Sequence, residues 1–390
     1  MKRPGTGAAA DAGTGAGRLY IRKREYYNAP IIHCSRVPAV KGGSVMSWLD
    51  RIAAVEALED ARLDAALVAE YERAAQHTVG REIRFSTPTF RSYAGCEVSG
   101  CGKNSFPAFS VTAAGCALMC DHCQAKILEP MIPAVSPDAL DRQVRDLIAR
   151  EDLRGFLLSG GSNRRNEIRY ERYYPVVERL KHDFPHLRIA IHSALLDERR
   201  AKLMEAAGVD TAMMDVIGSR ETIAEVYHLD RSVEDFEATL AALCTTSMEV
   251  VPHIVIGLHY GRVHGEANAL DIVSRHRIQS LVLVVVMPFY AKPGSFVTPA
   301  TGDIGRIFLE ARRRVPGDQV LLGCARPPGM HRRVTDAYAV MAGLDGIAFP
   351  ADGTLAVATA IGRPAVQEHA CCSIRTGQTI KLHGRASVAV

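Results

Sequence analysis

The chain has 390 residues, of which 47% are hydrophobic, and its 47 Lys and Arg residues are nearly balanced by 43 Asp and Glu residues. This is enough apolar material for one large core or two smaller ones, and the scattered basic residues give no sign of nucleic-acid binding. The longest apolar run, LVLVVVMPF at 281–289, is far shorter than the roughly 20 residues of a bilayer span, so we expect no membrane association. The opening stretch MKRPGTGAAADAGTGAG lacks the apolar segment of a signal peptide, which predicts a cytoplasmic protein.

Composition divides the chain into four regions. Residues 1–45 begin with a Gly-, Ala- and Thr-rich stretch, and we expect them to be disordered or to precede a true start at Met46. Residues 46–105 open with an amphipathic pattern, SWLDRIAAVEALEDARLDAALVAEYERAA, which predicts a helical N-terminal extension. Residues 106–375 alternate between strand and helix patterns, and residues 376–390 form a C-terminal tail.

Eight short segments rich in apolar and β-branched residues are predicted strands, and helical patterns such as PDALDRQVRDLIARED separate them. Every interval leaves room for a crossover helix, so the predicted fold is α/β, a (β/α)8 TIM-like barrel. An open doubly wound sheet is the alternative, but no GxGxxG motif follows the first strand. The predicted strands are 108–112, 155–160, 188–193, 211–216, 249–257, 281–288, 319–324 and 346–350.

The ten cysteines of a chain without a secretory signal are predicted to be reduced thiols rather than disulfides. Cys116, Cys120 and Cys123 form a C-x3-C-x2-C pattern in the loop after the first predicted strand, at the edge where barrels place their active sites. Structural zinc takes four ligands and would need His122 as the fourth. Three thiolates alone would leave one iron of a [4Fe–4S] cluster open to a non-protein ligand.

This spacing in this loop resembles the signature of the radical S-adenosylmethionine (radical SAM) enzymes. The resemblance implies a [4Fe–4S] cluster on Cys116, Cys120 and Cys123, with S-adenosylmethionine chelated by the open iron. One-electron reduction, typically by a low-potential ferredoxin or flavodoxin, then yields a 5′-deoxyadenosyl radical. The family usually has an aromatic residue before the last cysteine, and this chain has His122 there.

Other positions resemble the cofactor-binding positions of that family. LLSGGS at the end of the second strand corresponds to a GGE-like motif that approaches the methionine moiety, and HIVIG in the fifth strand corresponds to an adenine-contacting segment without its usual glutamate. Polar residues at the ends of the third and fourth strands could bind ribose hydroxyls. The alternative for the glycine pair is an ordinary turn from strand to loop. The alternative for the two polar residues is a helix N-cap or a strand-end polar group whose hydrogen bonds are already satisfied. We assign no catalytic side chain; the cofactor-binding candidates are Ser159, Gly160, Gly161, Ser162, His192, Asp215, Ile256, Gly257 and Arg326.

Five further cysteines are candidate ligands of a second, auxiliary [4Fe–4S] cluster. One ends the seventh predicted strand, two form a C-x4-C pair before the first strand, and two are adjacent after the last strand. Any one of them could be an inert buried thiol, which is the interpretation that we prefer for Cys244 within a helical pattern. The candidates are Cys96, Cys101, Cys324, Cys371 and Cys372.

Longer segments over roughly residues 80–375 are similar to the biotin- and lipoyl-synthase branch, most of all to the two-protein type of lipoyl synthase. They include FPAFSVTAAGCALMCDHCQAKILEPMIPA, VYHLDR, VVPHIVIGLHYG and GCARPPGMHRRVTDAYAVMAGLDGIAFP, followed by CCS. The resemblance implies a sulfurtransferase that inserts sulfur at C6 or C8 of an octanoyl chain on a lysine of a carrier protein, while a second radical SAM subunit serves the other carbon. The auxiliary cluster would donate the sulfur.

One departure concerns the ligands of the auxiliary cluster. Single-protein lipoyl synthases carry C-x4-C-x5-C, and this chain has Phe106 or Pro107 where the third cysteine would stand. The third ligand would then come from Cys324 or from the Cys371–Cys372 pair.

Two other interpretations remain open at the level of the sequence. A biotin-synthase-like enzyme or a mutase would act on a different small molecule, and a mutase needs no auxiliary cluster. A non-catalytic iron–sulfur scaffold or electron carrier would need neither a glycine-lined cofactor slot nor a full barrel.

Overall fold

The structure is a computed structural model that describes residues 46–87, 97–98, 105–316, 319–375, 377 and 379–382. All of these residues lie in the larger of the two units into which the chain divides, residues 34–390. Among them, no helix is both long and apolar enough to cross a lipid bilayer.

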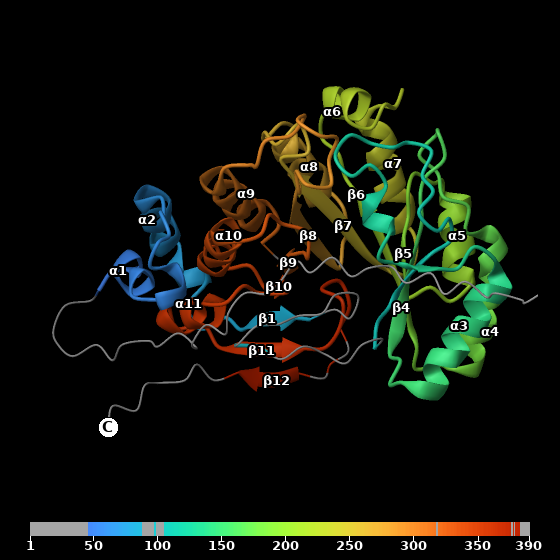
Figure 1. The fold of residues 1–390 in the computed structure, drawn as a ribbon, viewed down its shortest axis with the longest axis horizontal. Helices are drawn as coiled ribbons and strands as arrows, with labels where there is room; N and C mark the ends of the chain where they lie inside the picture. The colour runs from blue at the N-terminus through green and yellow to red at the C-terminus, as the bar shows by residue number, and fades with distance from the viewer. Residues whose placement is uncertain are drawn as a thin grey trace, which may run out of the picture. The chain divides into compact units, whose positions relative to one another are not determined.

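All eight predicted strands are present, and they run side by side in chain order within one sheet (Figure 1). They are β2 (Ala108–Ser110), β4 (Gly155–Ser159), β5 (Arg188–His192), β6 (Thr211–Asp215), β7 (Glu249–Ile256), β8 (Ser280–Val285), β9 (Gln319–Leu322) and β10 (Gly346–Ala348). Four unpredicted strands extend the sheet: β1 (Ile83–Ser86), β3 (Ile132–Pro133), β11 (Ala365–Glu368) and β12 (Thr379–Leu382). The order is β12-β11-β1-β10-β9-β8-β7-β6-β5-β4-β2-β3, and each neighbouring pair is parallel except β11 with β12.

Helices connect the parallel strands, which confirms the predicted α/β, TIM-like arrangement. Local sequence explains where they begin: the Ser136 hydroxyl accepts from the Ala139 amide at 3.2 Å ahead of Pro137, and Ser232 with Asp235 forms a capping box. The crossover helices are α3 (Pro137–Arg150), α4 (Tyr174–Asp183), α5 (Glu198–Ala206), α6 (Arg220–Glu225), α7 (Val233–Cys244), α8 (Glu266–Ser274), α9 (Thr301–Arg314), α10 (Met330–Met341) and α11 (Thr354–Ala360).

The expected helical extension contains α1 (Trp48–Ala53) and α2 (Ala65–Arg73), but it also contributes β1. The α2 side chain Tyr71 donates from its hydroxyl to the Gly305 carbonyl of α9 at 2.7 Å. Strand β1 lies between β10 and β11, so the expected boundary near residue 105 does not divide the sheet. Strand β12 likewise adds part of the expected C-terminal tail to the sheet.

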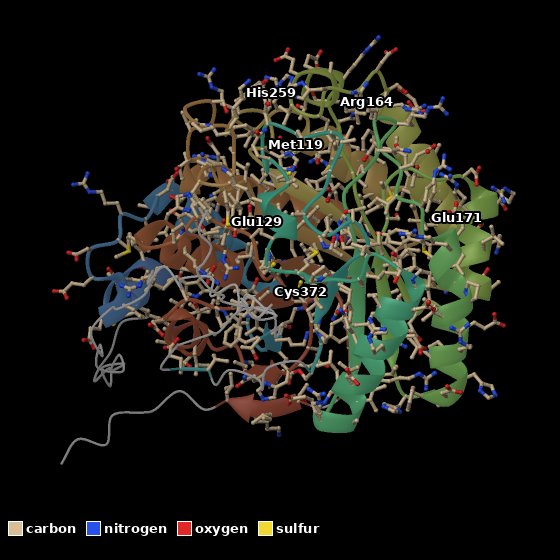
Figure 2. All side chains as sticks on the ribbon, turned by 45° about the vertical axis from the view of Figure 1, so that its right-hand side comes forward. Met119, Glu129, Arg164, Glu171, His259 and Cys372 are labelled. Carbon is tan, nitrogen blue, oxygen red and sulfur yellow. The ribbon has the colours of Figure 1, made fainter. Side chains whose placement is uncertain are left out.

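Apolar side chains pack on both faces of the sheet. On the helix side they form the main core, to which Ile83 and Phe85 of β1 belong. Inside the curve of the sheet a second cluster, here called the interior core, takes a side chain from each of β5 to β10 and adds residues from the chain after β11. Its buried members are Phe106, Ala190, Met213, Val251, Val282, Leu321, Ala348, Phe349, Ala370, Cys372 and Ile374. The segment 370–374 therefore fills the interior of the sheet, and Figure 2 shows Cys372 toward the middle of the molecule.

Candidate active site

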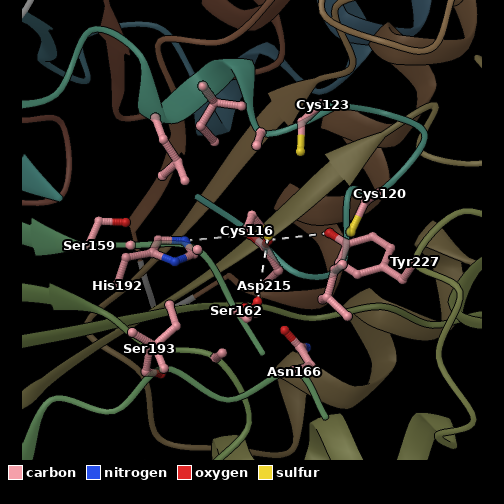
Figure 3. Close-up of a pocket in the computed structure, with 18 of the residues that line it drawn as sticks. Cys116, Cys120, Cys123, Ser159, Ser162, Asn166, His192, Ser193, Asp215 and Tyr227 are labelled. Atoms are coloured by element: carbon pink, nitrogen blue, oxygen red, sulfur yellow. Dashed lines mark hydrogen bonds and ion pairs between the residues drawn. The ribbon is translucent and has the colours of Figure 1, made fainter. Parts of the chain in front are cut away.

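The loop that follows β2 carries Cys116, Cys120 and Cys123, and all three line one cavity with an empty volume of about 770 Å³ (Figure 3). The Cys123 and Gln124 amides donate to the Cys120 carbonyl at 3.2 and 2.9 Å. The Gln124 side chain donates to the carbonyls of Met119 and Cys120 at 2.9 and 3.0 Å, which closes the loop on itself. Met119, Gln124 and Ala125 have positive φ angles of 45°, 47° and 56°, an arrangement that persists only where surrounding contacts hold it.

The glycine pair after β4 lies directly against this loop. A Cβ atom on Gly161 would stand 2.0 Å from the Gly115 carbonyl oxygen, and one on Gly160 would stand 2.8 Å from the Val111 side chain. Cys116 Sγ donates to the Ser162 carbonyl at 3.8 Å, and that carbonyl also accepts from the Ala117 amide at 2.9 Å. The glycines thus allow two backbone segments to touch, one of which holds the cysteines.

Acid and imidazole groups also line the cavity. His192 Nε2 at the end of β5 lies 3.7 Å from Asp215 Oδ1 at the end of β6, and the Tyr227 hydroxyl donates to Asp215 Oδ2 at 3.5 Å. Burial alone would raise the pKa of Asp215, but hydrogen bonding and charge from His192, with help from His253, lower it to about 2. Burial lowers the pKa of His253 to about 4. Near neutral pH, Asp215 is therefore an ionised acceptor at the cavity wall.

His122, the candidate fourth ligand of a zinc ion, lines the same cavity as the three cysteines. Its ring stacks on Tyr227, with centroids 5.0 Å apart and an interplanar angle of 24°, and its shielded Nδ1 atom has no hydrogen-bond partner within the described part of the chain. Burial lowers the pKa of this imidazole to about 4. Throughout the described ranges, no three His, Cys, Asp or Glu side chains converge tightly enough to hold a single metal ion. The arrangement therefore gives no support to structural zinc.

The donor set does fit an iron–sulfur cluster, which is larger than one ion and is held by thiolates spread around it. Burial raises the pKa of Cys123 to about 11; Cys116 and Asp215 act in the same direction, and a backbone hydrogen bond at Ala125 acts against them. Burial, followed by Cys123 and Cys116, raises the pKa of Cys120 further. Such thiols become thiolates only when a positively charged metal group replaces their protons.

The predicted cofactor-binding residues separate into two groups. Ser159, Gly160, Gly161, Ser162, His192 and Asp215 line the cavity together with the three cysteines. Ile256 is buried in the main core, and the amide of Gly257 donates to the Glu266 carboxylate at 2.7 Å. Arg326 does not line the cavity: it is buried, forms an ion pair with Asp336 at 2.6 Å, and donates to the carbonyls of Gly323 and Phe349.

Several lining residues were not predicted. Tyr227 and Asn166 face the cavity from connecting segments, and Leu195 and Phe236 add an apolar wall. No spacing signals such residues, because their positions depend on how each connection folds back over the strand ends. Glu266 was also missed; its buried carboxylate reaches the Gly257 backbone from α8, nine residues along the chain.

A second group of thiols gathers in the interior core. Cys324 follows β9, Cys371 and Cys372 follow β11, and Cys324 and Cys371 pack against the cluster that contains Cys372. A hydrogen bond from Cys372 lowers the pKa of Cys371, while that bond and burial raise the pKa of Cys372. All three thiols are free of disulfides. Cys96 and Cys101 lie outside the described residues.

A comparison with known protein families covers both the sheet and the loop after β2 that carries Cys116, Cys120 and Cys123, here called the Cys loop. Residues 110–267 match the Radical SAM superfamily. This stretch includes the three cysteines, the glycine pair, His192 and Asp215, and it forms a radical SAM domain. The match covers less than half of the chain; it identifies this stretch as a radical SAM domain, and such a domain indicates an enzyme.

Solved structures that align with this chain share little sequence with it. HydG, a maturase of the [FeFe]-hydrogenase, aligns with a TM-score of 0.51 and 13% identity over 74% of this chain and 62% of its own length. Methylornithine synthase (PylB) aligns with a TM-score of 0.49 and 12% identity, over 76% of this chain and 81% of its own. Streptococcus suis SuiB, bound to its precursor peptide SuiA, aligns with a TM-score of 0.44 and 10% identity, over 70% of this chain and 54% of its own. No curated protein matches the sequence.

The superfamily implies a [4Fe–4S] cluster and S-adenosylmethionine. The cluster would be held by the thiols of Cys116, Cys120 and Cys123.

Proposed function

We propose that this protein is a radical SAM sulfurtransferase of the lipoyl-synthase type. It inserts sulfur at C6 or C8 of an octanoyl chain that is amide-linked to a lysine of a carrier protein. The observation that carries this proposal is the meeting of Cys324, Cys371 and Cys372 inside the sheet whose Cys loop lines the cavity. These three thiols provide the ligands of an auxiliary [4Fe–4S] cluster, with Cys96 and Cys101 as further candidates.

When bound, the first cluster with S-adenosylmethionine supplies hydrogen-atom removal from an unactivated C–H bond, and the auxiliary cluster supplies sulfur. The chain's own residues bind the cofactor and the substrate and hold them in position. The ionised Asp215 carboxylate accepts hydroxyl hydrogen bonds, His192 keeps that carboxylate in place, and Asn166 and Ser193 add polar groups at the same wall. Leu118, Ile168, Leu195 and Phe236 keep water from the reacting carbon.

The entrance to the cavity suits an acyl chain. Ile127 lines the cavity and yet is 45% exposed, and Met119 in the same Cys loop is 46% exposed. Apolar side chains left in water beside a cavity indicate contact with an apolar partner group. The proposed partners are an octanoylated carrier domain, a second radical SAM subunit for the other carbon, and a low-potential ferredoxin or flavodoxin. We propose the cytoplasm as the location, since the thiols need a reducing compartment.

The test uses anaerobically reconstituted protein, dithionite, S-adenosylmethionine and an octanoyl-lysyl carrier peptide, with and without a second radical SAM subunit. Mass spectrometry should show the peptide gaining one sulfur, together with 5′-deoxyadenosine. If 5′-deoxyadenosine forms but the peptide is unchanged even with the second subunit, sulfur insertion into octanoyl chains is wrong. A mutase or another small-molecule enzyme would then bind about four irons per chain instead of about seven or eight. Absence of S-adenosylmethionine cleavage would indicate a non-catalytic scaffold.

A further inference from the structure

One inward-facing residue of β1 carries a charge. Ile83 and Phe85 pack into the main core, so the alternation of a strand places Arg84 and Ser86 on the inner face of the sheet. Arg84 lies opposite Gly346 of β10 and Val366 of β11, and only 11% of its side chain is exposed. A cation in such a place needs specific partners, because burial without them is strongly unfavourable.

The partners of Arg84 belong to the end of β11 and the segment that follows it. Arg84 Nη2 donates to the Cys372 carbonyl at 3.2 Å, and Nη1 lies 3.3 Å from the Glu368 carboxylate, whose side chain is 2% exposed. The third donor group, Nε, is shielded from solvent and has no hydrogen-bond partner among the described residues. Two contacts thus orient the guanidinium beside the Cys371–Cys372 pair, and one buried N–H is left over.

A leftover buried donor is uncommon in native proteins and calls for an acceptor. The nearby thiols are weak acceptors while protonated, but thiolates and cluster sulfides are anionic acceptors. A [4Fe–4S] core of charge +2 on three thiolates is a net anion, and each added electron makes it more negative. Arg84 is a cation oriented by Cys372, one of the three proposed ligands, and its charge can offset that of such a centre.

We propose that Arg84 is a positioning residue for an anionic iron–sulfur centre on Cys324, Cys371 and Cys372. Glu368 and the Cys372 carbonyl fix the guanidinium, and its charge and unused Nε–H are available to the sulfur atoms. Arg84 then raises the reduction potential of this centre, while Glu368 lowers it. The proposal rests on the auxiliary cluster of the proposed function and names the residues that tune it.

The test uses the full chain carrying Cys116→Ala, Cys120→Ala and Cys123→Ala, so that only the second centre can be loaded. The protein is reconstituted anaerobically with ferrous iron and sulfide, and a redox titration is followed by electron paramagnetic resonance. Arg84→Gln should lower the reduced-to-oxidised ratio at fixed potential at least tenfold, a shift of 59 mV for one electron. Glu368→Gln should shift the potential in the opposite direction.

Arg81→Gln is the matched control, since Arg81 precedes the same strand and pairs with Asp345 at 2.6 Å; its potential should equal that of the background protein. If Arg84→Gln does not fold, Arg84→Gln combined with Glu368→Gln removes both buried charges. The potential of that double variant should lie below that of Glu368→Gln alone.

Unchanged potentials, or shifts of the same sign in both single variants, would overturn the role of Arg84 but leave the auxiliary cluster in place. A background protein that binds no iron at all would overturn both the auxiliary cluster and this inference.

Discussion

Gly161 and Cys116 are in backbone contact: a Cβ atom added to Gly161 would lie 2.6 Å from the Cys116 Cα. The Gly161 amide also donates to the Thr112 hydroxyl at 2.7 Å, which holds the end of β4 against the start of the Cys loop. Both contacts come from backbone or short side chains, which have little freedom to move aside. The position of the first cluster ligand therefore depends on residue 161 having no side chain.

Gly161→Ala should displace the Cys loop and weaken both groups that the cavity would hold. We expect at least a twofold loss of iron after reconstitution and at least a tenfold loss of S-adenosylmethionine affinity, with the circular dichroism spectrum unchanged. Gly302→Ala on α9 is the control, because an added Cβ there meets no atom closer than 3.5 Å. Full iron content in Gly161→Ala would contradict this account.

His122→Phe should make the protein less sensitive to acid. Burial holds the pKa of His122 at about 4 in the fold, below roughly 6.5 in an unfolded chain. The folded state therefore binds fewer protons than the unfolded state between these values, and stability falls as the pH drops from about 6.5 to about 4. Phenylalanine keeps the stack on Tyr227 without the titration. Urea unfolding at pH 7.5 and 4.5 should show a loss smaller by about 1 to 3 kcal/mol than in the wild type.

The control for this comparison is His182→Gln, which changes an imidazole whose side chain is 87% exposed. Its unfolding free energy should fall with acid as steeply as that of the wild type. An equally steep fall in His122→Phe would mean that other groups account for the acid sensitivity.

Arg326→Leu should destabilise the fold strongly. Both side chains of the Arg326–Asp336 pair are completely inaccessible to solvent, so loss of the arginine leaves an unpaired buried carboxylate and costs about 3 to 5 kcal/mol. Arg326→Leu combined with Asp336→Leu should recover most of that loss, as measured by urea unfolding. If the double variant is no more stable than the single one, the hydrogen bonds from Arg326 to Gly323 and Phe349 matter more than the ion pair.

Cys371→Ala should separate the two halves of the proposed chemistry. The substituted thiol lies in the interior core, whereas the first cluster depends on the Cys loop. We therefore expect 5′-deoxyadenosine to form at close to the wild-type rate while thiolation of the carrier peptide falls at least a hundredfold. Cys244→Ala, at the end of α7, removes a thiol that donates to the Arg277 carbonyl and should leave both products unchanged. Thiolated product from Cys371→Ala would remove this cysteine from the ligand set.

Sequence patterns predicted most of the sheet because buried parallel strands are continuous apolar runs. β7 and β8 are of this kind, with segments such as EVVPHIVI and SLVLVV. β1 is only IRFS, and it has an inward arginine where a strand pattern would have an apolar residue. β11 follows a glycine and a proline and is four residues long. Such short strands form because they pair with neighbouring strands that are distant in the sequence. A local sequence pattern therefore does not predict them.

The Cys loop was predictable because three cysteines at fixed spacing have few other uses. Tyr227 and Asn166 could not be found in this way, since each comes from a connection whose path depends on tertiary packing. Arg326 shows the opposite case: its place after a strand suggested the cavity, yet its guanidinium bonds to Asp336 in the protein interior. A charged residue near a strand end forms its ion pair with whichever partner the tertiary packing places beside it.

The placement of β1 between β10 and β11 also constrains how the protein is made. Ile83 pairs with Ala365, so roughly 280 residues must be synthesised after β1 before both its edges are covered, which takes roughly 15 to 60 seconds at ribosomal rates. Over that time the strand and its apolar residues Ile83 and Phe85 have no sheet to join, which exposes them to wrong pairing with other chains. Docking of the preceding helices cannot protect them, because α2 packs on α9 and α10, which are also made late. The sheet is therefore completed only when translation is nearly finished. The yield of folded protein should depend on how well the nascent chain is protected from pairing with other chains.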